Sequence, residues 1–229
     1  MTSPLRGISS MATRLLLAEL TEAYRQRTGQ AVQIESVGGV DAARRVQAGE
    51  AFDVVLLASD AIAQLEAAGR VLPGSAVPLV RSGVGVAVRA GAPRPDLSSA
   101  DAVRRAVAAA RRLSCSTGPS GVALARLFER WGLGAELADR TVTPPPGTPV
   151  GSLVASGAVD LGFQQLSELI HLDGIDVVGP LPPDIQIVTT FTGAVCATCD
   201  RPEAVRDLLA FLASPDTAAA KQRQGMDPA

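Results

Sequence analysis

Small hydroxyl and glycine residues cluster where predicted strands give way to predicted helices. The richest such segment, STGPSG at 116–121, holds three hydroxyl residues and two glycines, although capping a helix needs only one hydroxyl. A helix N-terminus offers unpaired N–H groups and about half a positive charge, so a ligand that reaches it there would be an anion. Ordinary helix capping remains the alternative. The candidate anion-binding residues are Ser9, Ser10, Gly38, Gly39, Ser59, Ser116, Thr117, Ser120, Pro149 and Val150.

Two adjacent amides stand out in the apolar segment GFQQL. Gln164 and Gln165 end a predicted strand, so their polar groups need partners there. Either a structural hydrogen-bond network or a ligand would satisfy them, and the sequence leaves both open. Gln164 therefore joins the ligand-binding candidates.

Scarce residue types exclude several chemistries. His171 is the only histidine and Lys221 the only lysine, which argues against multi-histidine metal centres, Schiff-base lysines and P-loops. Three cysteines, Cys115, Cys196 and Cys199, are too few for a disulfide framework and fit a reducing compartment. We expect neither a metal nor a cofactor.

The composition narrows the ligand class further. The 229 residues are 47% hydrophobic with a net charge of -2, as expected for one globular unit or two small lobes. Twenty-one basic residues against 23 acidic ones leave no field to attract nucleic acid, and 3% aromatic residues leave few stacking platforms. A ligand must therefore be held by backbone amides, hydroxyls and arginine.

The elements that must position these residues alternate between strands and helices. The order strand, helix, strand, helix, strand over 5–58 predicts a parallel sheet with helices on its faces. A break at Pro73–Pro78 precedes a second set of alternating elements. Strands are expected at 5–8, 31–37, 53–58, 84–89, 113–116, 161–164 and 185–198, and helices at 12–27, 41–48, 60–68, 100–111, 122–131, 150–156, 202–213 and 215–224.

Four segments carry a family resemblance that spans nearly the whole chain. The first strand running into Ser9 and Ser10, GEAFDVVLLASD at 49–60, STGPSG at 116–121 and PVGSLVASGAVDLGFQQLSEL at 149–169 resemble the molybdate-binding branch of the type II periplasmic solute-binding proteins. The resemblance implies an α/β fold of two lobes, joined by two crossover strands, with a small anion in the cleft between them. It implies one lobe from 1–80 plus 190–229, and the other from 81–189.

Two departures from this branch open a second hypothesis. The loop after the second strand is Gly38-Gly39, where molybdate binders carry a hydroxyl. In those binders a tyrosine from the second lobe commonly completes the ligand shell, whereas the only tyrosine here, Tyr24, lies on the first helix. The same branch also includes enzymes resembling aconitate isomerase, which move a proton and a double bond within a tricarboxylate. Arg81 could grip such a carboxylate with two hydrogen bonds, or be a solvated hinge residue.

The sequence thus predicts a small-anion binding protein, for a carboxylate or an oxyanion, with an isomerase of unsaturated di- or tricarboxylates as the alternative. For the isomerase, the nearest groups able to act as a base are Glu168 and Cys115.

No run approaches the 18 apolar residues of a membrane span. The first ten residues lack a secretion signal, which predicts a cytoplasmic protein unless an export segment was removed. In that case the protein would be periplasmic, with an ABC permease as partner.

Overall fold

Three parallel strands with intervening helices build the first part of the chain in the computed structural model, which describes residues 3–145 and 147–229. Strand β1 (Leu5–Ser10) lies between β2 (Val32–Val37) and β3 (Val54–Ala58) and runs parallel to both. Strand β8 (Val188–Val195) then adds to β3 in the antiparallel sense. The parallel strands were predicted, whereas the antiparallel neighbour makes the sheet mixed.

Contacts divide the chain into two compact units. The first unit comprises the residues up to Arg81 together with Thr190–Ala229, and the second comprises Ser82–Thr189. The chain passes from one unit to the other within β4 (Val77–Arg89), and returns within β8.

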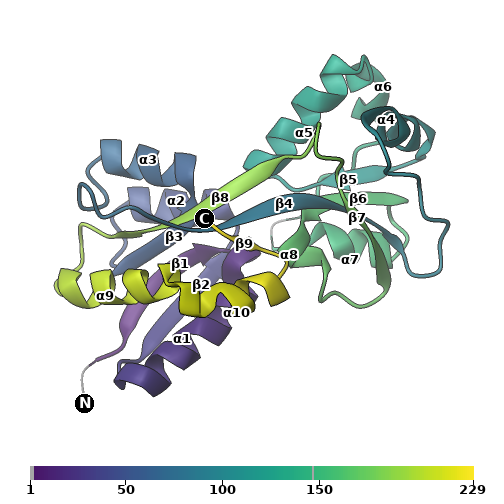
Figure 1. Cartoon of the computed structure of the whole chain (residues 1–229). Helices are drawn as coiled ribbons and strands as arrows, with labels where there is room; N and C mark the ends of the chain where they lie inside the picture. Colours follow the sequence, from purple (N-terminus) through teal and green to yellow (C-terminus); the bar gives the residue numbers. More distant parts are fainter. Residues whose placement is uncertain (1–2, 146) are drawn as a thin grey trace. The chain divides into compact units, whose positions relative to one another are not determined.

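Successive apolar residues of β3 point to opposite faces of the sheet in the first unit, so they supply a core on each face. Val54 and Leu56 of β3 belong to one core cluster, and Val55 and Leu57 belong to the other. Helices from both ends of the chain cover the first face, while α2 and α3 cover the second (Figure 1). The remaining elements of this unit are a 3-10 turn at Met11–Thr13, α1 (Arg14–Thr28), α2 (Gly39–Gln47), α3 (Ser59–Ala67), α9 (Pro202–Ala213), a 3-10 turn at Pro215–Thr217, α10 (Ala218–Arg223) and β9 (Asp227–Pro228).

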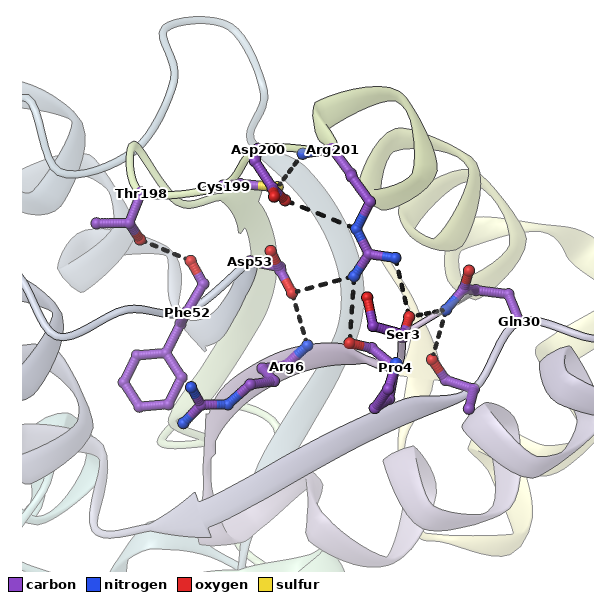
Figure 2. A network of polar contacts seen from close by, with 11 residues as sticks. Ser3, Pro4, Arg6, Gln30, Phe52, Asp53, Thr198, Cys199, Asp200 and Arg201 are labelled. Carbon is purple, nitrogen blue, oxygen red and sulfur yellow. Dashed lines mark hydrogen bonds and ion pairs between the residues drawn. The ribbon is translucent and has the colours of Figure 1, made fainter. Parts of the chain in front are cut away.

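A polar network fastens the start of β1 to the rest of this unit (Figure 2). The Arg201 guanidinium donates hydrogen bonds to the carbonyl oxygens of Ser3 and Pro4, at 2.9 and 3.2 Å. The carboxylate of Asp53, which directly precedes β3, accepts the backbone N–H of Arg6 at 2.7 Å. The same carboxylate pairs with Arg201 at 3.9 Å. These contacts position the strand whose other end carries Ser9 and Ser10.

The second unit has a sheet built on the second half of β4. Strand β6 (Leu161–Gln165) pairs with β4 in the antiparallel sense and with β5 (Leu113–Cys115) in the parallel sense, and β7 (Ile175–Pro180) is antiparallel to β4. Because β5 and β6 are parallel, their carboxyl ends meet at the same edge of the sheet. The helices of this unit are α4 (Ala100–Ala109), α5 (Pro119–Arg130), α6 (Gly134–Ala138), α7 (Val150–Ala155) and α8 (Leu166–Leu169).

Several boundaries differ from the predicted ones. Helix α5 begins at Pro119 rather than Val122, because proline is well suited to the first helical position. Ser120 therefore lies in the first turn of the helix rather than in the preceding loop. Strand β4 begins at Val77, inside the segment that was expected to break the structure, and β8 is shorter than the predicted 185–198. The elements α6, α8, β7 and β9 were not predicted.

Candidate functional site

Ser9 and Ser10 are the last two residues of β1, and both are buried. The Ser9 hydroxyl lies 2.8 Å from the Ser36 hydroxyl on the neighbouring strand β2 and donates to the Ser10 carbonyl oxygen at 3.2 Å. Ser36 was not singled out from the sequence, although parallel pairing places it directly beside Ser9. The Ser9 hydroxyl is thus engaged within the protein.

Ser10 differs from its neighbour in that its hydroxyl oxygen has no hydrogen-bond partner within the described part of the chain. The residue as a whole is only 7% exposed. A buried hydroxyl without a partner costs free energy, so such a group needs an explanation, and a ligand supplies one. A side chain placed at Gly39 would begin 3.6 Å from the Cβ atom of Ser10, which sets the unpaired hydroxyl beside the start of α2.

Helix α2 begins without a side-chain cap, since its N-cap residue is Gly38. Its first N–H groups therefore remain available to an anion. We call Ser10, Gly38 and Gly39 the first donor set. All three were predicted as ligand-binding residues, and they lie together in the first unit.

Ser59, at the start of α3, makes its hydrogen bonds within the first unit. Its hydroxyl donates to the carbonyl oxygen of Thr190 at 3.1 Å and lies 2.7 Å from the hydroxyl of Thr192. Because a serine has only one hydroxyl proton, these bonds use its donor inside the unit. Ser59 therefore fastens α3 to β8, an arrangement that only the antiparallel pairing of β3 with β8 reveals.

The loop after β5 is folded tightly onto the first turn of α5. The hydroxyls of Ser116 and Ser120 lie 2.9 Å apart, and the Ser116 N–H donates to the Phe163 carbonyl oxygen at 3.3 Å. One hydroxyl proton suffices for the Ser116–Ser120 bond, so the other remains available to a ligand. Thr117, in the same loop, is exposed.

Gln164 connects this edge of the sheet to α7 and α8. Its side-chain nitrogen donates to the Glu168 carboxylate at 2.8 Å, and its side-chain oxygen accepts the N–H of Gly151 at 3.4 Å. We call Ser116, Ser120 and Gln164 the second donor set. Pro149 is the N-cap residue of α7, and Val150 is fully buried in a small apolar cluster.

The two candidate bases differ sharply in acidity. Burial raises the pKa of Glu168 to about 7, against an opposing effect of the hydrogen bond from Gln164. Burial raises the pKa of the Cys115 thiol to about 12, so this thiol stays protonated at neutral pH. Glu168 is therefore the better supported of the two.

The remaining charged candidates lie at the surface. Arg81 is exposed on β4, where it pairs with Asp227 of β9 in the strand register, and its side chain makes no ion pair or hydrogen bond with the residues that the structure describes. His171 is also exposed.

Within 3–145 and 147–229, no group of three or more histidine, cysteine or acidic residues is placed so that it could hold a metal ion. No helix in those ranges has the length and apolar character needed to cross a membrane.

Sequence comparison finds a relative that matches most of the chain. The chain is 39% identical over 218 residues to a Pseudomonas protein named aconitate isomerase, covering 93% of this chain and 83% of that protein.

Solved structures share the fold. The periplasmic molybdate-binding protein of Azotobacter vinelandii matches with a TM-score of 0.80 and 21% identity, covering 97% of this chain and 98% of the other. A sulfate-binding protein from Mycobacterium tuberculosis matches with a TM-score of 0.77 and 17% identity, over 99% of this chain and 87% of the other. The predicted architecture, that of the type II periplasmic binding proteins, is therefore confirmed.

A family model described as bacterial extracellular solute-binding protein matches residues 5–227. That range includes both donor sets and every strand of both sheets except the last residue of β9. The chain therefore belongs to the bacterial extracellular solute-binding protein family.

Proposed function

We propose that this protein is an isomerase of an unsaturated di- or tricarboxylate, which moves a proton and a double bond along the carbon chain of its substrate. The relative named aconitate isomerase supports the reaction type, since its 39% identity extends over 93% of the chain. The structural observation that carries the anionic substrate is Ser10, a buried hydroxyl without a partner among the described residues, next to the uncapped start of α2.

Carboxylate groups match the donors that the two units present. In the first unit, the backbone N–H groups at the start of α2 and the hydroxyl of Ser10 are donors suited to a carboxylate. In the second unit, the hydroxyls of Ser116 and Ser120 can donate to a carboxylate in the same way. Arg81, exposed and without a described partner, is the cationic residue that we assign to the substrate.

The same donors would assist the chemistry as well as the binding. Removing a proton next to a carboxylate, in conjugation with a double bond, spreads negative charge onto the carboxylate oxygens. Fixed N–H and O–H donors at those oxygens stabilise the charge as it develops. Isomerisation of this kind needs no oxidant or reductant, because the substrate neither gains nor loses electrons overall.

A binding protein for a small oxyanion or carboxylate is the second candidate. It is favoured by the family description and by the match to the molybdate-binding protein of Azotobacter vinelandii. In that case the protein would deliver its ligand to an ABC permease in the periplasm rather than transform it. Gly38 and Gly39 have no side-chain donors, so we expect carboxylates to bind more tightly than molybdate in either case.

A ligand screen tests the proposal and separates the two candidates. Thermal unfolding would be followed with molybdate, tungstate, sulfate, and di- and tricarboxylates at equal concentration, because a bound ligand raises the melting temperature. Each hit would then be incubated with the protein in deuterated buffer and followed by proton NMR. We expect tricarboxylates to give the largest shifts and to exchange protons. Tight molybdate binding without carboxylate binding would contradict the proposed substrate class.

A further inference from the structure

Resting on the proposed isomerase, we infer that Glu168 is the catalytic residue that carries the proton between the two carbon atoms of the substrate, and that Gln164 is its positioning residue. Their relationship is direct, because the Gln164 side-chain nitrogen donates to a Glu168 carboxylate oxygen at 2.8 Å. Neither the family description nor the name of any relative assigns a role to either residue.

The place of Glu168 in the second unit supports this role. Gln164 lies in β6, and α8, which carries Glu168, follows at the carboxyl end of that strand. The loop that bears Ser116 and Ser120 leaves the carboxyl end of β5, the parallel neighbour of β6. The bond from the Ser116 N–H to the Phe163 carbonyl oxygen ties this loop to β6. The carboxylate and the second donor set therefore occupy the same edge of the sheet.

Gln164 is held so that it can present only its nitrogen to Glu168. Its side-chain oxygen accepts the Gly151 N–H, and the residue is 5% exposed. Two influences act on the pKa of Glu168: burial raises it, and the hydrogen bond from the Gln164 nitrogen lowers it. Asp176 on β7, which packs against α8, binds the backbone N–H of Gly91 instead. The neighbouring acidic and basic residues Asp173 and His171 are exposed.

A carboxyl group that titrates near neutral pH can both accept and return a proton at the pH of the cell. In the first step the Glu168 carboxylate removes a proton from the methylene carbon of the substrate. The C–H electron pair forms a new double bond, and the pair of the old double bond becomes part of a dienolate. In the second step the dienolate takes the proton from the Glu168 carboxyl at the former vinyl carbon. The carboxylate is regenerated, and no oxidant or reductant takes part.

The test compares Glu168→Gln with the wild type and with a matched control, Glu129→Gln. Glu129 is an exposed glutamate of α5 in the same unit. Isomerisation of trans-aconitate would be measured by proton NMR, and its binding by calorimetry. We expect Glu168→Gln to bind within about threefold of the wild type but to isomerise about 100-fold or more slowly, as is usual when a general base is removed. The control should match the wild type in both measurements.

A variant of the positioning residue provides a readout that a purely structural role would not change. Gln164→Leu removes the hydrogen bond that favours the ionised carboxylate, so the pKa seen in the pH dependence of kcat/KM should rise above that of the wild type. Its activity should therefore recover partly at higher pH. If Glu168→Gln does not fold, as judged by circular dichroism, the pH profiles of the wild type and of Gln164→Leu decide the question.

The outcomes separate this inference from the proposed function. A wild type that isomerises the substrate, together with an equally active Glu168→Gln, would overturn the role of Glu168 while leaving the isomerase in place. A wild type that binds tricarboxylates without isomerising them would overturn the proposed isomerase and this inference together. Unchanged pH profiles in Gln164→Leu would reject the positioning role alone.

Discussion

The Cβ atom of any side chain at Gly121 would lie 1.6 Å from the carbonyl oxygen of Ser116. Glycine is therefore required where the loop after β5 folds back onto α5, and this contact shapes the second donor set. We expect Gly121→Ala to lower the free energy of unfolding by about 1–3 kcal/mol, as overpacking does, and to weaken ligand binding. Chemical denaturation and calorimetry would measure the two effects.

Gly118 provides the matched control for that variant, because a Cβ atom at this position would meet no atom within 4 Å. Its φ of -86° also suits any residue. Gly118→Ala should leave stability nearly unchanged. Equal stability of the two variants would show that the Ser116 carbonyl can move away from residue 121 at little cost.

Ser10→Ala should separate binding from stability. The Ser10 hydroxyl has no partner in the described part of the chain, so its removal should leave the unliganded protein as stable as before or more so. Loss of a hydrogen bond to a charged ligand should weaken binding by about 1.5–3 kcal/mol. Ser9→Ala is the control, since Ser9 bonds to Ser36 and should show the reverse pattern. A stability loss confined to Ser10→Ala would mean that the hydroxyl serves the fold.

Arg81→Ala should weaken a carboxylate ligand by about 1.5–3 kcal/mol, the range for a lost hydrogen bond to a charged group. Thermal unfolding of the free protein should hardly change, because the side chain is exposed and makes no ion pair with the described residues. Arg126→Ala, at another exposed arginine, is the control. Normal binding in Arg81→Ala would identify the residue as a solvated hinge residue.

Glu168 should make the stability of the free protein depend on pH. Its pKa of about 7 in the folded state exceeds the ordinary value of 4.5, so the folded state holds this proton more tightly than the unfolded state does. The wild type should therefore lose stability as the pH rises from about 4.5 to about 7, by roughly 3 kcal/mol in all. Glu168→Gln should lack this loss. Its free energy of unfolding, measured by denaturation and compared with that of the wild type, should therefore be relatively higher at pH 8 than at pH 5. A constant difference between the two proteins would argue against the raised pKa.

Local patterns were sufficient to predict most of the fold. Apolar runs and periodicity located β1, β3 and α9 to within a few residues, because β1 and β3 are largely buried, α9 buries one face, and all three end at distinct signals. The short helices α6 and α8 were missed, since four or five residues give too little periodicity. Strand β7 was missed because none of its residues is fully buried, which leaves a weak pattern.

The partners of the candidate residues could not be predicted in the same way. The bonds from Ser9 to Ser36 and from Ser59 to Thr192 depend on which strands pair, and strand pairing is a property of the whole sheet. Gln164 and Glu168 are four residues apart, yet β6 ends between them, so helical spacing could not suggest their contact. Sequence alone left Ser9, Ser10 and Ser59 equivalent, and only their hydrogen bonds single out Ser10.

The most direct test of the isomerase is a proton NMR time course of the wild-type protein with trans-aconitate at pH 7, begun from the pure trans isomer. The proposed function predicts that the signals of cis-aconitate appear and rise to equilibrium at a rate proportional to protein concentration. If calorimetry shows that the tricarboxylate is bound while the trans isomer remains unchanged, the protein is a binding protein and not an isomerase.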